Sequence, residues 1–191
     1  TRDATRAFNI ACEEMEGYEA DDIIATLAAQ ARDAGGRCTI ISSDKDMMQL
    51  GGDGVVMMDA MKGNRIIDVQ GVEEKFGVGP NRVIDVQALA GDTADNVPGA
   101  PGIGIKTAAL LINEYGDLET LLDRASEIKQ PKRRQTLIDN RAQIELSKTL
   151  VQLDCNTPLE FTLDDLEVRD PDPETLLAFL AEMEFRTLTK R

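Results

Sequence analysis

The chain has 191 residues, a formal net charge of −14 and no histidine. Its length allows one sizeable hydrophobic core, and 42% hydrophobic with 29% charged residues is the composition of an ordinary globular protein. The lack of histidine excludes Ser-His triads, imidazole general bases and histidine zinc sites, and no apolar run is long enough to span a membrane. Hydrolytic chemistry here would have to use carboxylates, lysine or a metal.

The three cysteines (Cys12, Cys38 and Cys155) are widely spaced, and their number is odd. They form no closely spaced pairs of the kind that bind metals. This pattern indicates free thiols in a reducing compartment.

The first seventy residues read as alternating helix and strand. Residues 1–16 are expected to be helical. Residues 20–34 form an amphipathic helix with Asp21 and Asp22 in its first turn, ended by two glycines. Residues 37–42 form a buried strand, and this order is typical of a parallel α/β sheet. Ligands of such sheets bind at the carboxyl ends of the strands, where Asp44 and Asp46 fall.

Two more strands, at residues 55–58 and 65–68, are expected to be joined by a turn at 62–64. From about residue 71 the pattern is helical, and residues 159–168 could add a last strand or an extended passage. We therefore predict an α/β layer over 1–70 and a helical subdomain over 71–191. The helices are expected at these segments: 72–76, 80–90, 106–115, 118–125, 133–153 and 173–184. The C-terminal helices should pack back on the core.

Seven acidic residues fall in three short blocks along the chain. Each block alone has a structural explanation: acids in a first helical turn, an acidic loop, and an Asx-rich turn before a proline. If the blocks converge, two charges ~4 Å apart repel by roughly 4 kcal/mol. Divalent cations or protonation would relieve that repulsion, and among cations carboxylate oxygens favour Mg²⁺ or Mn²⁺. The candidate ligands are Glu19, Asp21, Asp22, Asp44, Asp46, Asp92 and Asp95.

A glycine-rich turn follows the third block, at residues 98–108. Its glycines let the backbone approach a phosphate closely, and Lys106 and Thr107 can donate to phosphate oxygens. A simple helix-joining turn is the alternative, and the spacing of a Walker loop is absent. The candidate DNA-binding residues of this turn are Gly102, Ile103, Gly104, Lys106 and Thr107.

A second basic segment contains Lys132, Arg133 and Arg134. It could be either a solvated surface or a further DNA contact. The net charge argues against nonspecific duplex binding. DNA binding depends, however, on how the charges are distributed over the surface, and an acidic protein can still have one basic face.

Taken together, these motifs resemble those of the flap endonuclease family, which includes the 5′-nuclease domains of bacterial DNA polymerases I. The resemblance runs through nearly the whole chain in order. The matching segments are Gly17–Ile24, Ser43–Asp46, Gly91–Asn96 with Pro98 and Gly99, and Gly102–Ala108.

The resemblance implies a PIN-like α/β core with a parallel sheet and a helix–three-turn–helix element at about 80–125. It also implies 5′→3′ exonuclease activity and removal of 5′ flaps and RNA primers. The seven acids match the family's metal-site acids and would hold two Mg²⁺ or Mn²⁺ ions. The glycine turn would bind duplex DNA and K⁺. The partner would be the polymerase domain of the same parent chain, in the bacterial cytoplasm with the nucleoid and not at a membrane.

One departure concerns the start of the chain. Family members begin with a strand that bears a catalytic aspartate, followed by a basic helical arch, and neither precedes Thr1. We therefore expect a core that is incomplete at its N-terminus, weak duplex binding and weak or absent cleavage. Two other classes fit the residues: a DNA-binding module whose acids are structural, and a PIN-type ribonuclease.

Overall fold

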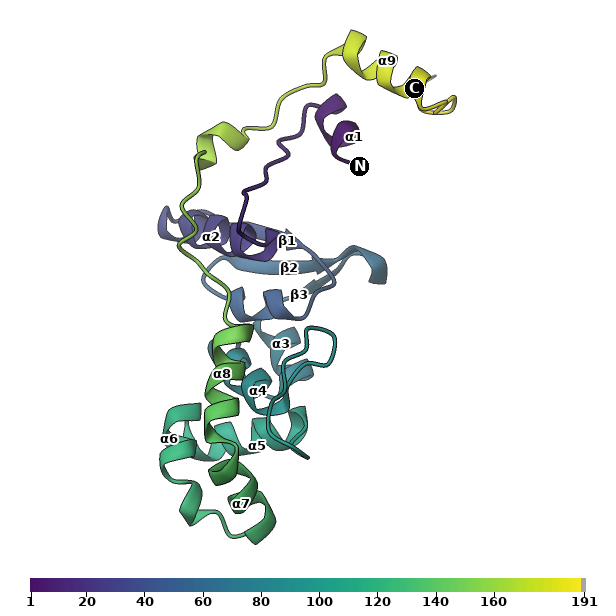
Figure 1. The fold of residues 1–191 in the computed structure, drawn as a ribbon. Helices are drawn as coiled ribbons and strands as arrows, with labels where there is room; N and C mark the ends of the chain where they lie inside the picture. The colour runs from purple at the N-terminus through teal and green to yellow at the C-terminus, as the bar shows by residue number, and fades with distance from the viewer. Residues whose placement is uncertain (190–191) are drawn as a thin grey trace.

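The computed structural model describes residues 1–189 and consists of a small sheet followed by a helical body (Figure 1). The strands are β1 (Cys38–Ile41), β2 (Val55–Asp59) and β3 (Arg65–Ile67). The helices are α1 (Arg2–Ala7), α2 (Ala20–Asp33), α3 (Val69–Phe76), α4 (Val83–Ala90), α5 (Ile105–Tyr115), α6 (Leu118–Asp123), α7 (Pro131–Asp139), α8 (Arg141–Val151) and α9 (Pro173–Glu182). Within residues 1–189, no helix has both the length and the apolar character needed to cross a lipid bilayer.

The sheet is mixed, so the expectation of a parallel sheet was wrong for its last strand. Strand β2 is parallel to β1, with Ile40 opposite Met57, and antiparallel to β3, with Met58 opposite Ile66. A short 3-10 turn and the left-handed Gly63 and Asn64 join β2 to β3. A connection this short can join only antiparallel neighbours, because a parallel pair needs a long crossover.

Helix α2 lies on one side of the sheet, and the helical body begins on the other (Figure 1). The apolar side chains of Ile23, Ala25 and Ala28 in α2 are buried, and α2 contacts β1 directly. The left-handed Gly35 ends the helix and turns the chain into β1. Strand β1 ends at Ile41, and Asp44 and Asp46 follow directly after its carboxyl end.

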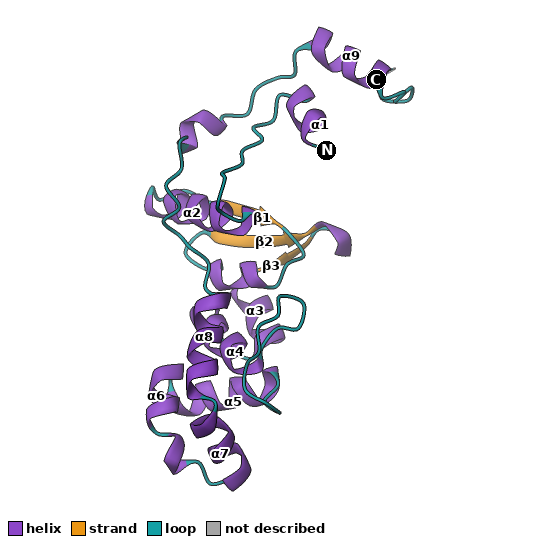
Figure 2. Ribbon diagram, in the orientation of Figure 1, coloured by secondary structure: helices purple, strands orange, loops and turns teal. Residues whose placement is uncertain are grey.

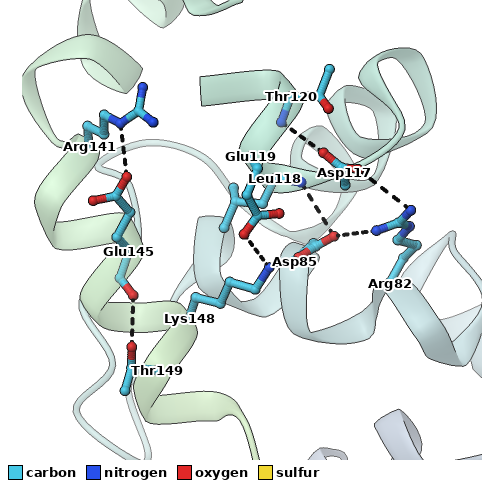
Figure 3. A network of polar contacts seen from close by, with 10 residues as sticks. All are labelled: Arg82, Asp85, Asp117, Leu118, Glu119, Thr120, Arg141, Glu145, Lys148 and Thr149. Carbon is cyan, nitrogen blue, oxygen red and sulfur yellow. Dashed lines mark hydrogen bonds and ion pairs between the residues drawn. The ribbon is translucent and has the colours of Figure 1, made fainter. Parts of the chain in front are cut away.

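Helix α4 is the centre of the helical body and packs against α5 and α8. A polar network fixes this arrangement (Figure 3). Lys148 of α8 reaches Asp85 of α4 at 3.0 Å and Glu119 of α6 at 2.6 Å, while Arg82 lies 3.2 Å from Asp85. Asp85 is buried, and a buried carboxylate is tolerated only when it is paired. The network thus joins three helices.

The two ends of the described chain lie apart from the sheet, where α1 and α9 contact each other (Figure 2). We expected the C-terminal helices to pack back on the core. Helix α8 does lie on α4, whereas α9 does not reach the sheet. The expected helix over 1–16 ends at Ala7 instead. The left-handed Asn9 interrupts it there and donates to the carbonyl of Asp170 at 2.8 Å.

One further expectation was also wrong. The expected single helix at 133–153 is broken at Asn140, whose side chain donates to the carbonyl of Thr136 at 2.8 Å. Of the two alternatives for residues 159–168, the strand does not form. Thr162 and Asp165 instead form a capping box that starts a 3-10 turn.

Candidate metal and nucleic-acid site

Three acidic side chains from two distant segments meet at the carboxyl end of β1. The carboxylates of Asp46, Asp92 and Asp95 each offer an oxygen within 4.8 Å of the others. Asp46 begins the 3-10 helix that follows β1, and the other two lie in the loop after α4. We call these three residues the carboxylate trio.

The loop of the trio is held in shape by its own backbone. Asp92 and Val97 exchange backbone hydrogen bonds of 2.8 and 2.7 Å, and the Oδ1 of Asp92 accepts from the N–H of Ala94 at 3.0 Å. Gly91 and Gly99 both have positive φ and lie against each other. A Cβ on Gly99 would come within 2.6 Å of the Cα of Gly91. Only glycine fits there, so these residues fix the direction of Asp92.

Electrostatic coupling links the first and second acidic blocks. Burial raises the pKa of Asp21, and the charges of Asp44, Glu19, Asp46 and Asp22 raise it further. These carboxylates therefore lie close enough to repel one another. Acids that are about twenty residues apart in the sequence share one region of the surface.

Coupling also joins the second block to the third. Burial raises the pKa of Asp46, and the charges of Asp44 and Asp92 add to this, while a hydrogen bond from Gln87 opposes it. The charges thus form one continuous group from α2 to the loop after α4. Its members differ in their surroundings.

Asp22 and Glu19, from the first acidic block, lie at the margin of this group of carboxylates. One oxygen of Asp22 accepts from the backbone N–H of Asp154 at 2.9 Å, which ties it to the segment after α8. Glu19 precedes α2, is exposed, and makes no capping hydrogen bond through its side chain. The structure therefore gathers the carboxylate trio tightly, with Asp21 and Asp44 beside it.

Sequence reasoning missed two polar residues of the site. Gln87 of α4 is 2% exposed, donates to the Oδ1 of Asp46 at 2.5 Å, and has a buried Oε1 with no hydrogen-bond partner among residues 1–189. Its position in an apolar helix gave no signal. Lys45 pairs with the buried Oδ2 of Asp92. Its place between two candidate ligands could have drawn attention to it.

The Lys45 pairing decides the charge state of Asp92. Burial pushes the pKa of Asp92 upward, but the hydrogen bond from Lys45 and the N–H of Ala94 hold that pKa below its ordinary value. Asp92 therefore stays ionised. Three hard oxygen donors, a buried carboxylate oxygen and a single neighbouring ammonium fit a divalent cation of the Mg²⁺ or Mn²⁺ type.

The glycine turn presents backbone to solvent between α4 and α5. Gly102 and Gly104 are exposed, and no atom would contact a Cβ placed on either. Ile103 between them is only 5% exposed and its N–H donates to the carbonyl of Ala100 at 3.1 Å, so it anchors the turn in the core and leaves the two glycines as the exposed backbone. Lys106 is exposed in the first turn of α5, and Thr107 is half-buried with its N–H bonded to Gly104.

The basic segment of α7 lies beside this turn. A cavity of about 260 Å³ is lined by Gly102 and Ile103 on one side and by Lys132 and Arg133 on the other. Arg134 points elsewhere and donates to the carbonyl of Ile128 at 3.2 Å. The structure therefore joins two of the three basic residues to the glycine turn.

Comparison with known proteins identifies the family of the chain. Residues 1–77 match the family described as 5′-3′ exonuclease, N-terminal resolvase-like domain, and residues 78–174 match 5′-3′ exonuclease, C-terminal SAM fold. The chain belongs to the 5′-3′ exonuclease family. DNA polymerase I of Rhizobium leguminosarum is 55% identical over 190 residues, which cover all of this chain and 19% of that protein. The chain thus spans about a fifth of the curated relatives it matches.

Solved structures of a phage enzyme share the fold. The bacteriophage T5 5′-exonuclease with bound zinc has a TM-score of 0.67 and 26% identity, covering 73% of this chain and 52% of that one. The T5 flap endonuclease in a pseudo-enzyme–product complex with DNA and metal ions gives the same TM-score, identity and coverage. The chain accordingly has an α/β 5′-nuclease fold, and its two parts are those of the 5′-3′ exonuclease family.

Proposed function

We propose that the chain hydrolyses phosphodiesters at 5′ ends and 5′ flaps of duplex DNA, including RNA primers, with two Mg²⁺ or Mn²⁺ ions. The observation that carries this proposal is the carboxylate trio followed directly along the chain by the exposed glycine turn. One feature suits divalent metal and the other suits a phosphate backbone.

The seven acids would divide between two ions. Asp46, Asp92 and Asp95 would hold one, and Asp21 and Asp44, with Glu19 and Asp22, would complete the second. When bound, such a pair of ions would supply polarisation of the scissile phosphate and a lower pKa for an attacking water. Gln87 would keep Asp46 oriented by its hydrogen bond.

DNA would be held by the glycine turn and α7. The open space around Gly102 and Gly104 leaves room for a phosphate against the backbone, and Lys106 and Lys132 add positive charge nearby. Such contacts set the position of the duplex without reading its sequence. We also propose K⁺ at the backbone of the turn, by analogy with the family.

The wider setting follows from the relatives. The T5 flap endonuclease binds DNA and metal ions, and the curated relatives are DNA polymerases I. We therefore propose a 5′-flap duplex as substrate, a polymerase domain in the same parent chain, and action on nucleoid DNA in the bacterial cytoplasm.

A glycine substitution tests the DNA contact without disturbing the fold. Gly104 has an ordinary φ of −99° and open space around it, so Gly104→Ala should keep the stability and lower the affinity for a 5′-flap duplex about tenfold. Gly36→Ala is the control, because its Cβ would lie 3.1 Å from the carbonyl of Ala31, at the opposite end of β1 from the acids. This variant should lose stability and keep its DNA affinity.

Cleavage tests the metal requirement. Any cleavage of a 5′-flap duplex by the chain should need Mg²⁺ or Mn²⁺, stop with a chelator, and be lost in Asp92→Asn. Cleavage that survives the chelator would contradict the proposal. Preference for RNA over flap DNA in a side-by-side assay would favour a ribonuclease instead.

A further inference from the structure

A second polar cavity, separate from the glycine turn, opens next to the acids. It has a volume of about 300 Å³, and its walls come from the end of β1, the β2–β3 hairpin and α3. Ser43 lines it and directly precedes Asp44, so the cavity adjoins the proposed metal site. Its charged and polar lining residues are Ser43, Asp59, Lys62, Arg65, Glu74 and Lys75.

Two of its three cations have partners. Lys62 lies 3.1 Å from the buried carboxylate of Asp59, which this pairing neutralises. Arg65 lies 3.1 Å from Glu74, and more than half of each of these two side chains is exposed. An exposed pair of this kind contributes little stability, so Arg65 can turn to another anion at small cost.

Lys75 is the third cation, and it makes no ion pair within residues 1–189. Burial lowers the pKa of its ammonium, and the positive charges of Lys62 and Lys45 lower it further. The charges of Asp44 and Asp46 act in the opposite direction. Three cations and two acids thus line the cavity, both acids are already paired, and an anion in the cavity would give Lys75 the partner that it lacks. In a protein of net charge −14, such a cavity is unexpected.

We propose that this cavity binds a phosphate of the nucleic-acid strand next to the scissile bond, through Lys75, Arg65 and the hydroxyl of Ser43. The proposal rests on the proposed nuclease function, because the neighbouring acids identify the ligand as nucleic acid. A guanidinium and an ammonium together suit phosphate oxygens. The volume allows a phosphate with its adjoining sugar. The phosphate could be an internal phosphodiester or the terminal group of a released mononucleotide.

DNA affinity measured over a range of salt concentrations tests this site. The probe is a fluorescent 5′-flap duplex in Ca²⁺ with the whole chain. Arg65→Gln/Lys75→Gln should lower the affinity about tenfold and reduce the slope of log affinity against log salt by about 0.7–0.9 per lost phosphate contact. The control is Arg37→Gln, an exposed cation before β1 at the opposite end of the strand. It should change neither quantity.

The outcomes separate this site from the proposed function. If Gly104→Ala weakens binding and the double variant does not, the phosphate site is refuted and the nuclease proposal stands. If neither variant weakens binding, both fail. A parallel titration with thymidine 5′-monophosphate identifies the phosphate. Mononucleotide binding that the double variant loses supports a terminal phosphate, whereas a defect confined to DNA supports an internal one. Circular dichroism confirms that the variant is folded.

Discussion

The ammonium of Lys45 pairs with the Oδ2 of Asp92, a buried oxygen within the carboxylate trio. Lys45 comes from between Asp44 and Asp46, so its charge is tethered inside the group of acids. A divalent ion that binds Asp92 through this oxygen must displace the ammonium. Lysine and metal therefore compete for one carboxylate.

Replacing the lysine should release that competition. Lys45→Met is expected to bind Mn²⁺ about tenfold more tightly, which corresponds to about 1.4 kcal/mol. Without metal the same variant should be less stable, because Asp92 keeps a buried charge without its partner. Isothermal titration and thermal denaturation measure the two effects.

Lys62→Met is the matched control for this prediction. Lys62 also pairs with a buried carboxylate, that of Asp59, but outside the trio. It should lose stability and leave Mn²⁺ affinity unchanged. Weaker Mn²⁺ binding by Lys45→Met would show that the lysine assists the metal rather than competing with it.

The carboxylate of Asp46 should lower the stability of the metal-free fold, because it lies close to other negative charges. Its pKa is raised, so its contribution to stability is full below the unfolded pKa and is lost as the pH rises through the folded pKa. Ionised Asp46 therefore destabilises the metal-free fold at neutral pH. We expect Asp46→Asn to raise the melting temperature at about pH 7 and to have little effect near pH 3, below the ordinary carboxyl pKa of about 3.9.

In saturating Mg²⁺ the native protein should melt at a higher temperature than Asp46→Asn. Mg²⁺ stabilises the native fold by binding to the Asp46 carboxylate, which the variant lacks. Thermal denaturation at both pH values, with and without Mg²⁺, provides the comparison. A metal-free Asp46→Asn that melts below the native protein at neutral pH would argue against charge repulsion in the trio.

Thr26 holds the segment after α8 against α2. Its buried hydroxyl donates to the carbonyl of Asp154 at 3.1 Å and accepts from the N–H of Thr157 at 3.0 Å. Thr26→Val leaves both backbone groups unsatisfied and should cost about 1–3 kcal/mol. Thr149→Val removes an exposed hydroxyl that bonds within its own helix, and should change stability by less than about 0.5 kcal/mol. Urea denaturation measures both, and equal losses would disprove the tether.

The loop that carries Asp92 should depend on a glycine that touches no ligand. Gly99→Ala would push a Cβ to within 2.6 Å of the Cα of Gly91 and should lower Mn²⁺ affinity at least about tenfold. Gly102→Ala also has a positive φ but meets open space, so it should lose only about 1 kcal/mol of stability and keep its Mn²⁺ affinity. Unchanged Mn²⁺ binding in Gly99→Ala would contradict the role of the close contact.

Local patterns predicted the elements that depend on local forces. The amphipathic residues 20–34 and the β-branched run at 37–42 form α2 and β1, and Asp46 lies at the end of that strand as expected. Asn9, by contrast, ends α1 early through a bond to Asp170, far away in the sequence. The direction of β3 depends on a tight turn whose backbone angles the residue pattern did not specify.

Long-range contacts also limited what could be foreseen in the site. Lys45 and Gln87 act on acids that lie 47 and 41 residues away in the sequence. The apolar helix around Gln87 gives no sign of this, and the place of Lys45 between two candidate ligands does not indicate that its partner is Asp92. Asp22 was grouped with the metal acids, and its bond to Asp154 could be found only in three dimensions. The burial of Ile103 likewise shows that only part of the glycine turn is available to DNA.

Anomalous diffraction from crystals soaked in Mn²⁺ tests most directly whether these acids form a metal centre. We expect one manganese peak between Asp46, Asp92 and Asp95 and a second toward Asp21 and Asp44, with Lys45 displaced from Asp92. Manganese bound only elsewhere, or no peak at these carboxylates, would contradict the account.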